Sequence, residues 1–279
     1  MTDLVIGSAY NLNWEQCRLW VKSLVKSGYD GDKAIVIFGD NDALCENFNN
    51  YNFKIIKVRN LKPDEHICSA RFAVYHSYLN SPEVKGKYDK VIATDVTDVV
   101  FQRNPSEFMH SQDLVPHYGL VASSENIRYK DEQWGANNVR ASFGDEAYEK
   151  VMNNEIYNAG VIAGSQSMFA ELSFLIYNLC QGRPQHVPGG GGPDQAAYNI
   201  LLNKFVRQST TYMGHNDGWA CQVGTVADPK KDYSKFNVEP NPILENGIAK
   251  TTTNIPYYII HQYNRNPIWN AAIREKYNV

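Results

Sequence analysis

The stretch YDKVIATDVTDVVF, residues 88–101, decides the fold of this chain. Its first seven residues predict a buried strand, and this strand leads directly into Asp95 and Asp98. Near-continuous apolar strands are typical of a parallel sheet that is covered on both faces. In open sheets of this kind, ligands bind beyond the carboxyl ends of the strands. The two aspartates therefore stand where we expect a ligand.

The residues before this stretch alternate between strand and helix patterns. The predicted strands span residues 4–9, 34–38 and 53–58, and the predicted helices span residues 14–26 and 69–79. Apolar strands that alternate with amphipathic helices indicate an α/β fold. We therefore predict a doubly wound, mostly parallel sheet.

The second half of the chain is less regular in its pattern. Helices are predicted over residues 167–180 and 194–204, with long loops rich in Gly, Pro, Asn and Tyr between and after them. Loops on a rigid sheet commonly shape a substrate cleft. No linker composition separates two independent domains. We expect one domain over residues 1–279, with an irregular second half.

Composition excludes several classes of protein. The net charge is −3 without a long basic run, so we expect no nucleic acid partner. No apolar run reaches the roughly 18 residues that a membrane span needs, and the first residues carry Asp3 in place of the apolar core of a signal peptide. The 5 cysteines are scattered, which favours reduced thiols. Together with the absence of Asn-x-Ser/Thr glycosylation acceptors, these features predict a cytoplasmic location and no membrane span.

Asp95 and Asp98 form the strongest chemical pattern in the sequence. Two like charges at the end of a strand repel each other and favour a divalent cation beside them. Oxygen ligands favour a hard ion, Mg²⁺ or Mn²⁺, over zinc. The alternative is that both aspartates cap turns, which is common for this residue type in loops.

Further motifs follow in an order that carries a resemblance. They are Arg71, the pair Asp95 and Asp98, Asn158-Ala159-Gly160, Asp194-Gln195 and His261. This order resembles that of metal-dependent glycosyltransferases of the GT-A fold, in particular the glycogenin and lipopolysaccharide galactosyltransferase group, over most of the chain. The resemblance implies transfer of a sugar from a UDP-sugar to a hydroxyl of an oligosaccharide or glycoprotein acceptor. It also implies a nucleotide-binding half over about residues 1–105 and an acceptor-binding half over about residues 106–279.

The resemblance assigns the metal and phosphate contacts. Asp98 and His261 would ligate the metal, and Asp95 would either join them or hold the ribose of the nucleotide. An imidazole ligand favours Mn²⁺ over Mg²⁺. Arg71 would grip a phosphate or brace the acidic pair. The alternatives are a hydrogen-bonded core histidine and a solvated surface arginine.

The resemblance also assigns the sugar contacts. Asn158 would bind a sugar hydroxyl, and Gly160, after Ala159, would let the backbone approach closely. An ordinary turn is the alternative for this tripeptide. Asp194 is the predicted catalytic residue: in an inverting enzyme it would take the proton of the acceptor hydroxyl. In a retaining enzyme Asp194 would bind the sugar, with Gln195 near the reacting face. The structural alternative for Asp194 is that it only caps the N-terminus of a helix.

Two features depart from the family pattern. The acidic motif is Asp-x-x-Asp, with Thr97 where the second aspartate would normally fall. The sequence therefore does not decide which of Asp95 and Asp98 ligates the metal directly. The glycine run at residues 189–192 is unusual and would form a mobile lid over the acceptor site. Asp217 and Asp145 are weaker candidates for the base. We expect inversion over retention, although the glycogenin group implies retention.

A narrower resemblance concerns the stand-alone transferases that chloroviruses encode to build the glycans of their capsid protein. The missing leader, anchor and glycosylation acceptors of this sequence are similar to theirs. This resemblance implies UDP-xylose as the donor, a fucosyl acceptor and a location in the host cytoplasm.

Three other classes share parts of the pattern. A haloacid-dehalogenase-type phosphatase needs Asp-x-Asp-x-Thr, but Thr97 stands two residues after Asp95. A nucleotidyltransferase usually carries a Gly-rich loop with Lys or Arg after the first strand, which residues 7–13 lack. A sugar-binding protein without activity would be expected to lose the acidic motif or His261, and both are present.

Overall fold

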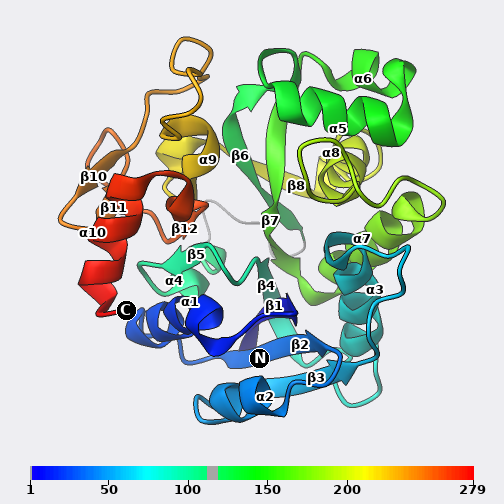
Figure 1. The fold of residues 1–279 in the computed structure, drawn as a ribbon, viewed down its shortest axis with the longest axis vertical. Coiled ribbons are helices and arrows are strands. Elements are labelled where there is room, and N and C mark those ends of the chain that lie inside the picture. Colours follow the sequence, from blue (N-terminus) through cyan, green and yellow to red (C-terminus); the bar gives the residue numbers. More distant parts are fainter. Residues whose placement is uncertain (1, 112–118) are drawn as a thin grey trace.

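The computed structural model describes residues 2–111 and 119–279 as an α/β structure built on one large sheet (Figure 1). In these residues seven strands pair in the order β3-β2-β1-β4-β7-β6-β8. They are β1 (Thr2–Tyr10), β2 (Asp32–Phe38), β3 (Lys54–Val58), β4 (Tyr88–Thr94), β6 (Leu120–Arg128), β7 (Glu155–Ser165) and β8 (Thr210–Met213). Only the pairs that involve β7 are antiparallel. The predicted α/β class with a mostly parallel sheet is confirmed.

Helices cover both faces of this sheet. Successive residues of a strand point to opposite faces, and β1 accordingly sends Leu4 into one core and Val5 into the other. One core includes side chains of α3 (Ile67–Leu79), α7 (Gln166–Cys180) and α8 (Asp194–Lys204). The other includes side chains of α1 (Trp14–Lys26) and α2 (Asp42–Asn49). Burial on both faces explains why the strand sequences read as continuous apolar runs.

The first half of the chain follows its sequence pattern except at α2. The predicted strands and the helices α1 and α3 are present within a few residues of the expected bounds. The helix α2, which has only two turns, was not predicted from the sequence. Its signals are the cap by Asn41, whose side chain accepts from the amide of Leu44, and the buried side chains of Leu44, Cys45 and Phe48. A pattern this short carries little periodicity to read.

The second half is more regular than its sequence indicates. It contains β6, β7 and the helices α5 (Gln133–Phe143) and α6 (Asp145–Val151), which the sequence analysis did not predict. The strand β6 reads LVASSENIR, and its polar centre is buried. A polar run reads as a loop from local pattern alone, whereas pairing with β7 and β8 makes it a strand. The predicted helices near residues 167–180 and 194–204 are present as α7 and α8.

A small second sheet joins distant parts of the chain. It has the order β5-β12-β9, from β5 (Val99–Phe101), β12 (Ile259–His261) and β9 (Ala220–Gln222). The last helix, α10 (Pro267–Tyr277), lies beside α1 (Figure 1), and the hydroxyl of Tyr277 donates to the carbonyl of Phe101 at 2.8 Å. The other α-helices and strands of the described residues are α4 (Pro105–Met109), α9 (Val223–Val226), β10 (Ile243–Glu245) and β11 (Ile248–Lys250). Among the described residues, no helix combines the length and the apolar character that crossing a membrane requires.

Candidate functional site

The acidic pair lies at the point where the strand order of the main sheet reverses. The chain builds β2 and β3 on one side of β1 and then places β4 on the other side. Asp95 directly follows β4, and its amide donates to the carbonyl of Gly160 on β7 at 2.8 Å. Ligands of open α/β sheets bind at such a switch point, outside the carboxyl ends of the strands. The fold therefore places Asp95 and Asp98 where the sequence predicted a ligand.

The small sheet brings His261 to this acidic turn. His261 pairs with Val99 on one side and with Gln222 on the other, and the amide of Gln262 donates to the carbonyl of Asp98 at 2.8 Å. These backbone bonds fix the imidazole beside the turn that connects β4 to β5. One ligand atom each from Asp95, Asp98 and His261 lie within 4.8 Å of one another.

The geometry of this cluster fits a divalent cation. The Nδ1 atom of His261 donates to Oε1 of Gln222 at 2.7 Å, because an amide oxygen only accepts. The Nε2 atom is buried without a hydrogen-bond partner, 3.5 Å from Oδ2 of Asp95 and 3.6 Å from Oδ1 of Asp98. Adjacent ligands of an octahedral ion stand about 3 Å apart, so small side-chain movements would complete the coordination. These three residues could therefore hold a hard divalent ion.

The two carboxylates of the cluster also stabilise a positive charge at the imidazole of His261. Burial alone lowers the pKa of His261, but the neighbouring carboxylates Asp98 and Asp95 outweigh it and raise the pKa to about 9. The imidazole therefore holds a proton when no cation is bound between the carboxylates. A metal ion would take the place of that proton, since ligation needs the neutral ring.

Arg71 on α3 binds two of the acidic residues at the site, Asp95 and Asp194. Its side chain is buried, and Nη1 donates to Oδ1 of Asp95 while Nη2 donates to the carbonyl of Ala159 at 3.1 Å and to Oδ2 of Asp194 at 3.2 Å. Burial alone would raise the pKa of Asp95, but the charges of Arg71 and His261 hold the pKa below its usual value. Of the two roles predicted for Arg71, the geometry fits the brace.

A second network surrounds a residue that the sequence analysis missed, Glu125 on β6. Its Oε1 atom accepts from the amide of Asn158 at 2.6 Å and from the amide of Gln195 at 3.0 Å. The oxygen of Gln195 accepts from the backbone amide of Ala159 at 3.2 Å, and that of Asn158 accepts from the amide of Gly160 at 2.6 Å. The structure thus brings Asn158, Ala159, Gly160 and Gln195 together around one carboxylate, whereas Asp194 contacts Arg71.

Gly160 lies between the two networks. A Cβ atom at this position would stand 2.8 Å from Nε2 of His261 and 2.9 Å from Oδ1 of Asn158. The imidazole therefore packs directly on the backbone of β7. The predicted close approach of the backbone to a sugar at Gly160 stays a prediction. Any larger residue would push the imidazole away from the carboxylates.

Glu125 was missed because its strand has an irregular register. The pairing of β6 with β7 shifts between Ala122 and Ser124 and again between Ser124 and Arg128, and Asn126 adopts a left-handed φ of 63°. Such bulges re-aim side chains next to functional sites. The one local signal is a polar Ser-Ser-Glu-Asn run inside an apolar segment, which reads as a loop.

Other predicted residues lie elsewhere. Asp145, at the start of α6, is exposed and pairs with Arg140. Asp217 is exposed, and its carboxylate accepts from the amide of Gly214 at 2.8 Å. The glycine run at 189–192 packs on α5, where Trp134 donates to the carbonyl of Gly190 at 3.2 Å. Its motion as a lid stays a prediction.

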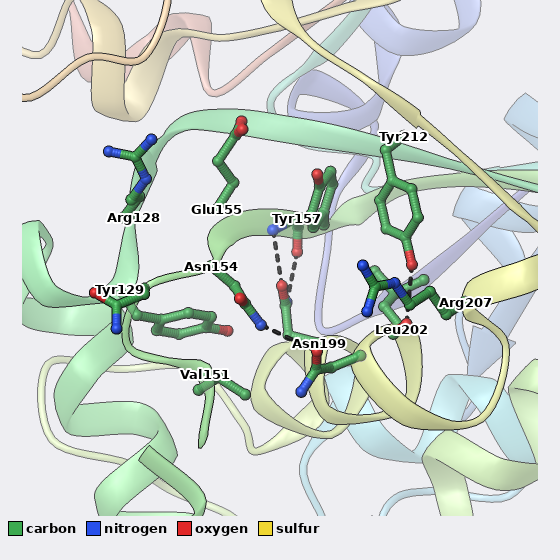
Figure 2. A pocket seen from close by; sticks show the side chains of 12 residues that line it. Arg128, Tyr129, Val151, Asn154, Glu155, Tyr157, Asn199, Leu202, Arg207 and Tyr212 are labelled. Atoms are coloured by element: carbon green, nitrogen blue, oxygen red, sulfur yellow. Dashed lines mark hydrogen bonds between the residues drawn. The ribbon is translucent and has the colours of Figure 1, made fainter. Parts of the chain in front are cut away.

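A separate pocket of about 350 Å³ lies beside Tyr157 of β7 (Figure 2). Its lining includes residues of β6, β7, α8 and β8, but not Asp95, Asp98 or His261. Asn199 closes its inner wall by donating to the carbonyl of Tyr157 and accepting from its amide, both at 2.8 Å. Tyr157 precedes Asn158 and faces away from the network around Glu125, because successive strand residues alternate in direction.

Comparison with known proteins gives no match. A scan against models of protein families matches none of them, and a search of curated proteins gives no match either. The fold and the site define an α/β protein with a candidate divalent-cation centre at the switch point of its sheet.

Proposed function

We propose that this protein is a metal-dependent glycosyltransferase of the GT-A type that moves a sugar from a UDP-sugar to a hydroxyl of a glycan acceptor. The observation that carries the proposal is the cluster of Asp95, Asp98 and His261, whose buried Nε2 has no hydrogen-bond partner. It lies directly beside the amide side chain of Asn158, across Gly160. A cation centre next to a group of amides suits a ligand that has a diphosphate at one end and hydroxyls at the other.

The residues of the site divide the work of binding such a donor. Asp95, Asp98 and His261 would hold Mn²⁺, with Mg²⁺ as the alternative ion. When bound, the ion would act as a Lewis acid toward the leaving diphosphate. Arg71 keeps Asp95 ionised and in place. Asn158 and Gln195 are held rigidly by Glu125, which suits recognition of sugar hydroxyls.

We propose UDP-xylose as the first donor to test and a fucosyl glycan as the first acceptor. These two choices come from the resemblance to the stand-alone chlorovirus transferases. The acceptor would contact the second half of the chain. In that half, β6, β7 and α8 carry Glu125 and the amides of Asn158 and Gln195.

Calorimetry with UDP, with and without Mn²⁺, tests the proposal. We expect UDP to bind only with the ion present, and we expect the Asp98→Ala variant to lose that binding. A panel of UDP-sugars and GDP-sugars with Mn²⁺, scored for nucleotide release, then identifies the donor. Binding of free sugars without nucleotide, or UDP binding that is indifferent to Mn²⁺ and to Asp98→Ala, would contradict the proposal.

A further inference from the structure

Glu125 is a carboxylic acid in the interior of the site, and its side chain contacts no guanidinium of the described residues. Its side chain is 5% exposed, and only its Oε1 atom accepts hydrogen bonds from the described residues, both of them from neutral amides. The other oxygen, Oε2, accepts no hydrogen bond from the described residues. One oxygen of this carboxyl group is thus fixed, and the other keeps its capacity to accept a proton.

The backbone around Glu125 is built to hold this orientation. The hydroxyl of Thr225 donates to the carbonyl of Glu125 at 2.5 Å. The neighbouring Asn126 is locked in its left-handed conformation by Glu239, whose amide donates to its side-chain oxygen at 2.7 Å and whose carbonyl accepts from its amide nitrogen at 2.9 Å. This bulge, with its left-handed Asn126, is held both by α9 and by the loop that contains Glu239, which indicates that the aim of the Glu125 side chain matters.

Glu125 lies one amide side chain away from the metal centre. Asn158 contacts Glu125 through Nδ2 at 2.6 Å, and its Oδ1 stands 2.9 Å from the position of a Cβ on Gly160, which would itself be 2.8 Å from Nε2 of His261. A sugar whose diphosphate is at the cluster would therefore lie next to Asn158 and within reach of Glu125. The acceptor hydroxyl would then lie between this sugar and Oε2 of Glu125.

Asp194 differs from Glu125 in its partner. Its Oδ2 atom accepts from the guanidinium of Arg71 at 3.2 Å, and the same guanidinium binds Asp95. Burial raises the pKa of Asp194, although the charge of Arg71 opposes this effect. Because one oxygen of Asp194 is bound to a cation whereas both partners of Glu125 are neutral amides, Asp194 fits a positioning residue for Arg71.

We propose that Glu125 is the catalytic base, which accepts the proton of the acceptor hydroxyl during sugar transfer. The inference rests on the proposed glycosyltransferase function. The hydroxyl oxygen forms a bond to the anomeric carbon while the bond from that carbon to the diphosphate oxygen breaks. The electron pair leaves with the diphosphate, and the hydroxyl proton moves to Oε2 of Glu125. A base on the face opposite the leaving group makes this a single displacement, so the configuration of the sugar inverts.

The surroundings of Glu125 tune it for this task. Burial, together with the charge of Glu132, raises the pKa of Glu125 to about 7, against the opposing effects of Asn158, Lys231 and Gln195. Of the other titratable groups nearby, Tyr129 is a buried phenol, and Tyr233 donates to Glu132 at 2.8 Å. A base with a pKa near the working pH combines the ionised form with a strong pull on the proton.

The variant Glu125→Gln tests the base directly. Glutamine keeps an oxygen acceptor for both amides, so the fold and the binding of UDP with Mn²⁺ should be unchanged. We expect the rate of UDP release from the active donor to fall about 10²- to 10⁴-fold at pH 8. The rising limb of the wild-type pH–rate profile near pH 7 should vanish in the variant. A Glu125→Gln variant with the wild-type rate and pH profile would overturn the proposal.

Two further variants separate a base from a structural role. Glu125→Asp keeps a carboxylate and should recover part of the lost rate, with the pH limb present. Glu132→Gln removes the charge that raises the pKa of Glu125, so we expect the limb to move to lower pH. A limb that does not move in Glu132→Gln, or that persists in Glu125→Gln, would assign it to another group.

The stereochemistry of transfer gives an independent readout. Methanol serves as a small acceptor whose methyl glycoside does not mutarotate, and ¹H NMR identifies the anomer formed from the active UDP-sugar. We expect inverted configuration, and a retained configuration would overturn the role of Glu125 while leaving the transferase proposal intact. If wild-type protein with Mn²⁺ neither binds UDP nor releases it from any donor, the proposed function itself fails before any variant is made.

Discussion

The two halves of the site are built on opposite principles. Around Asp95, Asp98 and His261, two carboxylates lie close to an imidazole nitrogen that has no hydrogen-bond partner among the described residues. Around Glu125, by contrast, the amides of Asn158 and Gln195 donate to one shared oxygen. The first half could hold a cation, whereas the second is already organised by its own hydrogen bonds. We call the group of Asp95, Asp98 and His261, with Arg71 beside it, the charged half, and the group around Glu125 the amide half. The difference indicates that ligand binding would order the charged half, whereas the amide half is already rigid.

The strongest test of this contrast removes a carboxylate from the charged half. We expect Asp98→Ala to lose Mn²⁺ binding and to reduce turnover by at least about 10³-fold, because an ion that stabilises the leaving group contributes several kcal/mol. Titration of Mn²⁺ by electron paramagnetic resonance measures the first effect, and UDP release measures the second. Asp145→Asn, an exposed acid on α6, is the matched control and should leave both unchanged.

Removal of Arg71 should destabilise the fold through the charged half. Arg71→Met leaves Asp95 and Asp194 without their buried partner, and breaking a buried ion pair in this way costs about 3–5 kcal/mol. Urea unfolding in the presence of EDTA measures the loss. We expect added Mn²⁺ to restore part of the stability, because the ion compensates Asp95. A loss below about 1 kcal/mol would show that the guanidinium does not brace the acids.

Burial of Glu125 in the amide half should make the free energy of unfolding depend on pH. Burial and Glu132 raise the pKa of Glu125 from 4.5 to about 7 in the folded state, so the folded state binds more protons than the unfolded state within that window. The stability that Glu125 contributes is therefore present below pH 4.5 and is lost as the pH rises through 7, by about 3 kcal/mol. Urea unfolding at pH 5 and pH 8 should show this loss in the wild type, relative to Glu125→Gln. Equal pH dependence in both proteins would contradict the raised pKa.

The smallest effect should come from the boundary between the two halves. Gly160→Ala places a methyl group against the imidazole of His261, and we expect the affinity for Mn²⁺ to fall about 10- to 100-fold, as for displaced supporting groups of a metal ligand. Gly164→Ala on the same strand is the control, since its methyl group would meet the carbonyl of Gly119 at 2.7 Å, away from the site. The control should lose stability but keep its metal affinity. Equal affinities in the two variants would count against the packing of His261 on β7.

Local pattern alone predicted much of residues 2–111 correctly. Apolar runs and helical spacing gave β1 to β4, α1 and α3, because each pattern spans a few neighbouring residues and needs no distant partner. The same pattern placed Asp95 and Asp98 after β4, at the edge where ligands bind. His261 entered through the order of motifs that resembles GT-A transferases, since nothing local marks it.

The rest was decided by contacts between residues far apart in the chain. Pairing of β12 with β5 sets His261 beside Asp98, and insertion of the antiparallel β7 between β4 and β6 brings Asn158 to Glu125. The polar centre of β6 becomes a strand only because β7 and β8 pair with it. Periodicity reports which face of an element is buried, but it does not report its partner or register. For this reason the sequence determined the scaffold and the acidic pair, and only the tertiary structure decided what surrounds them.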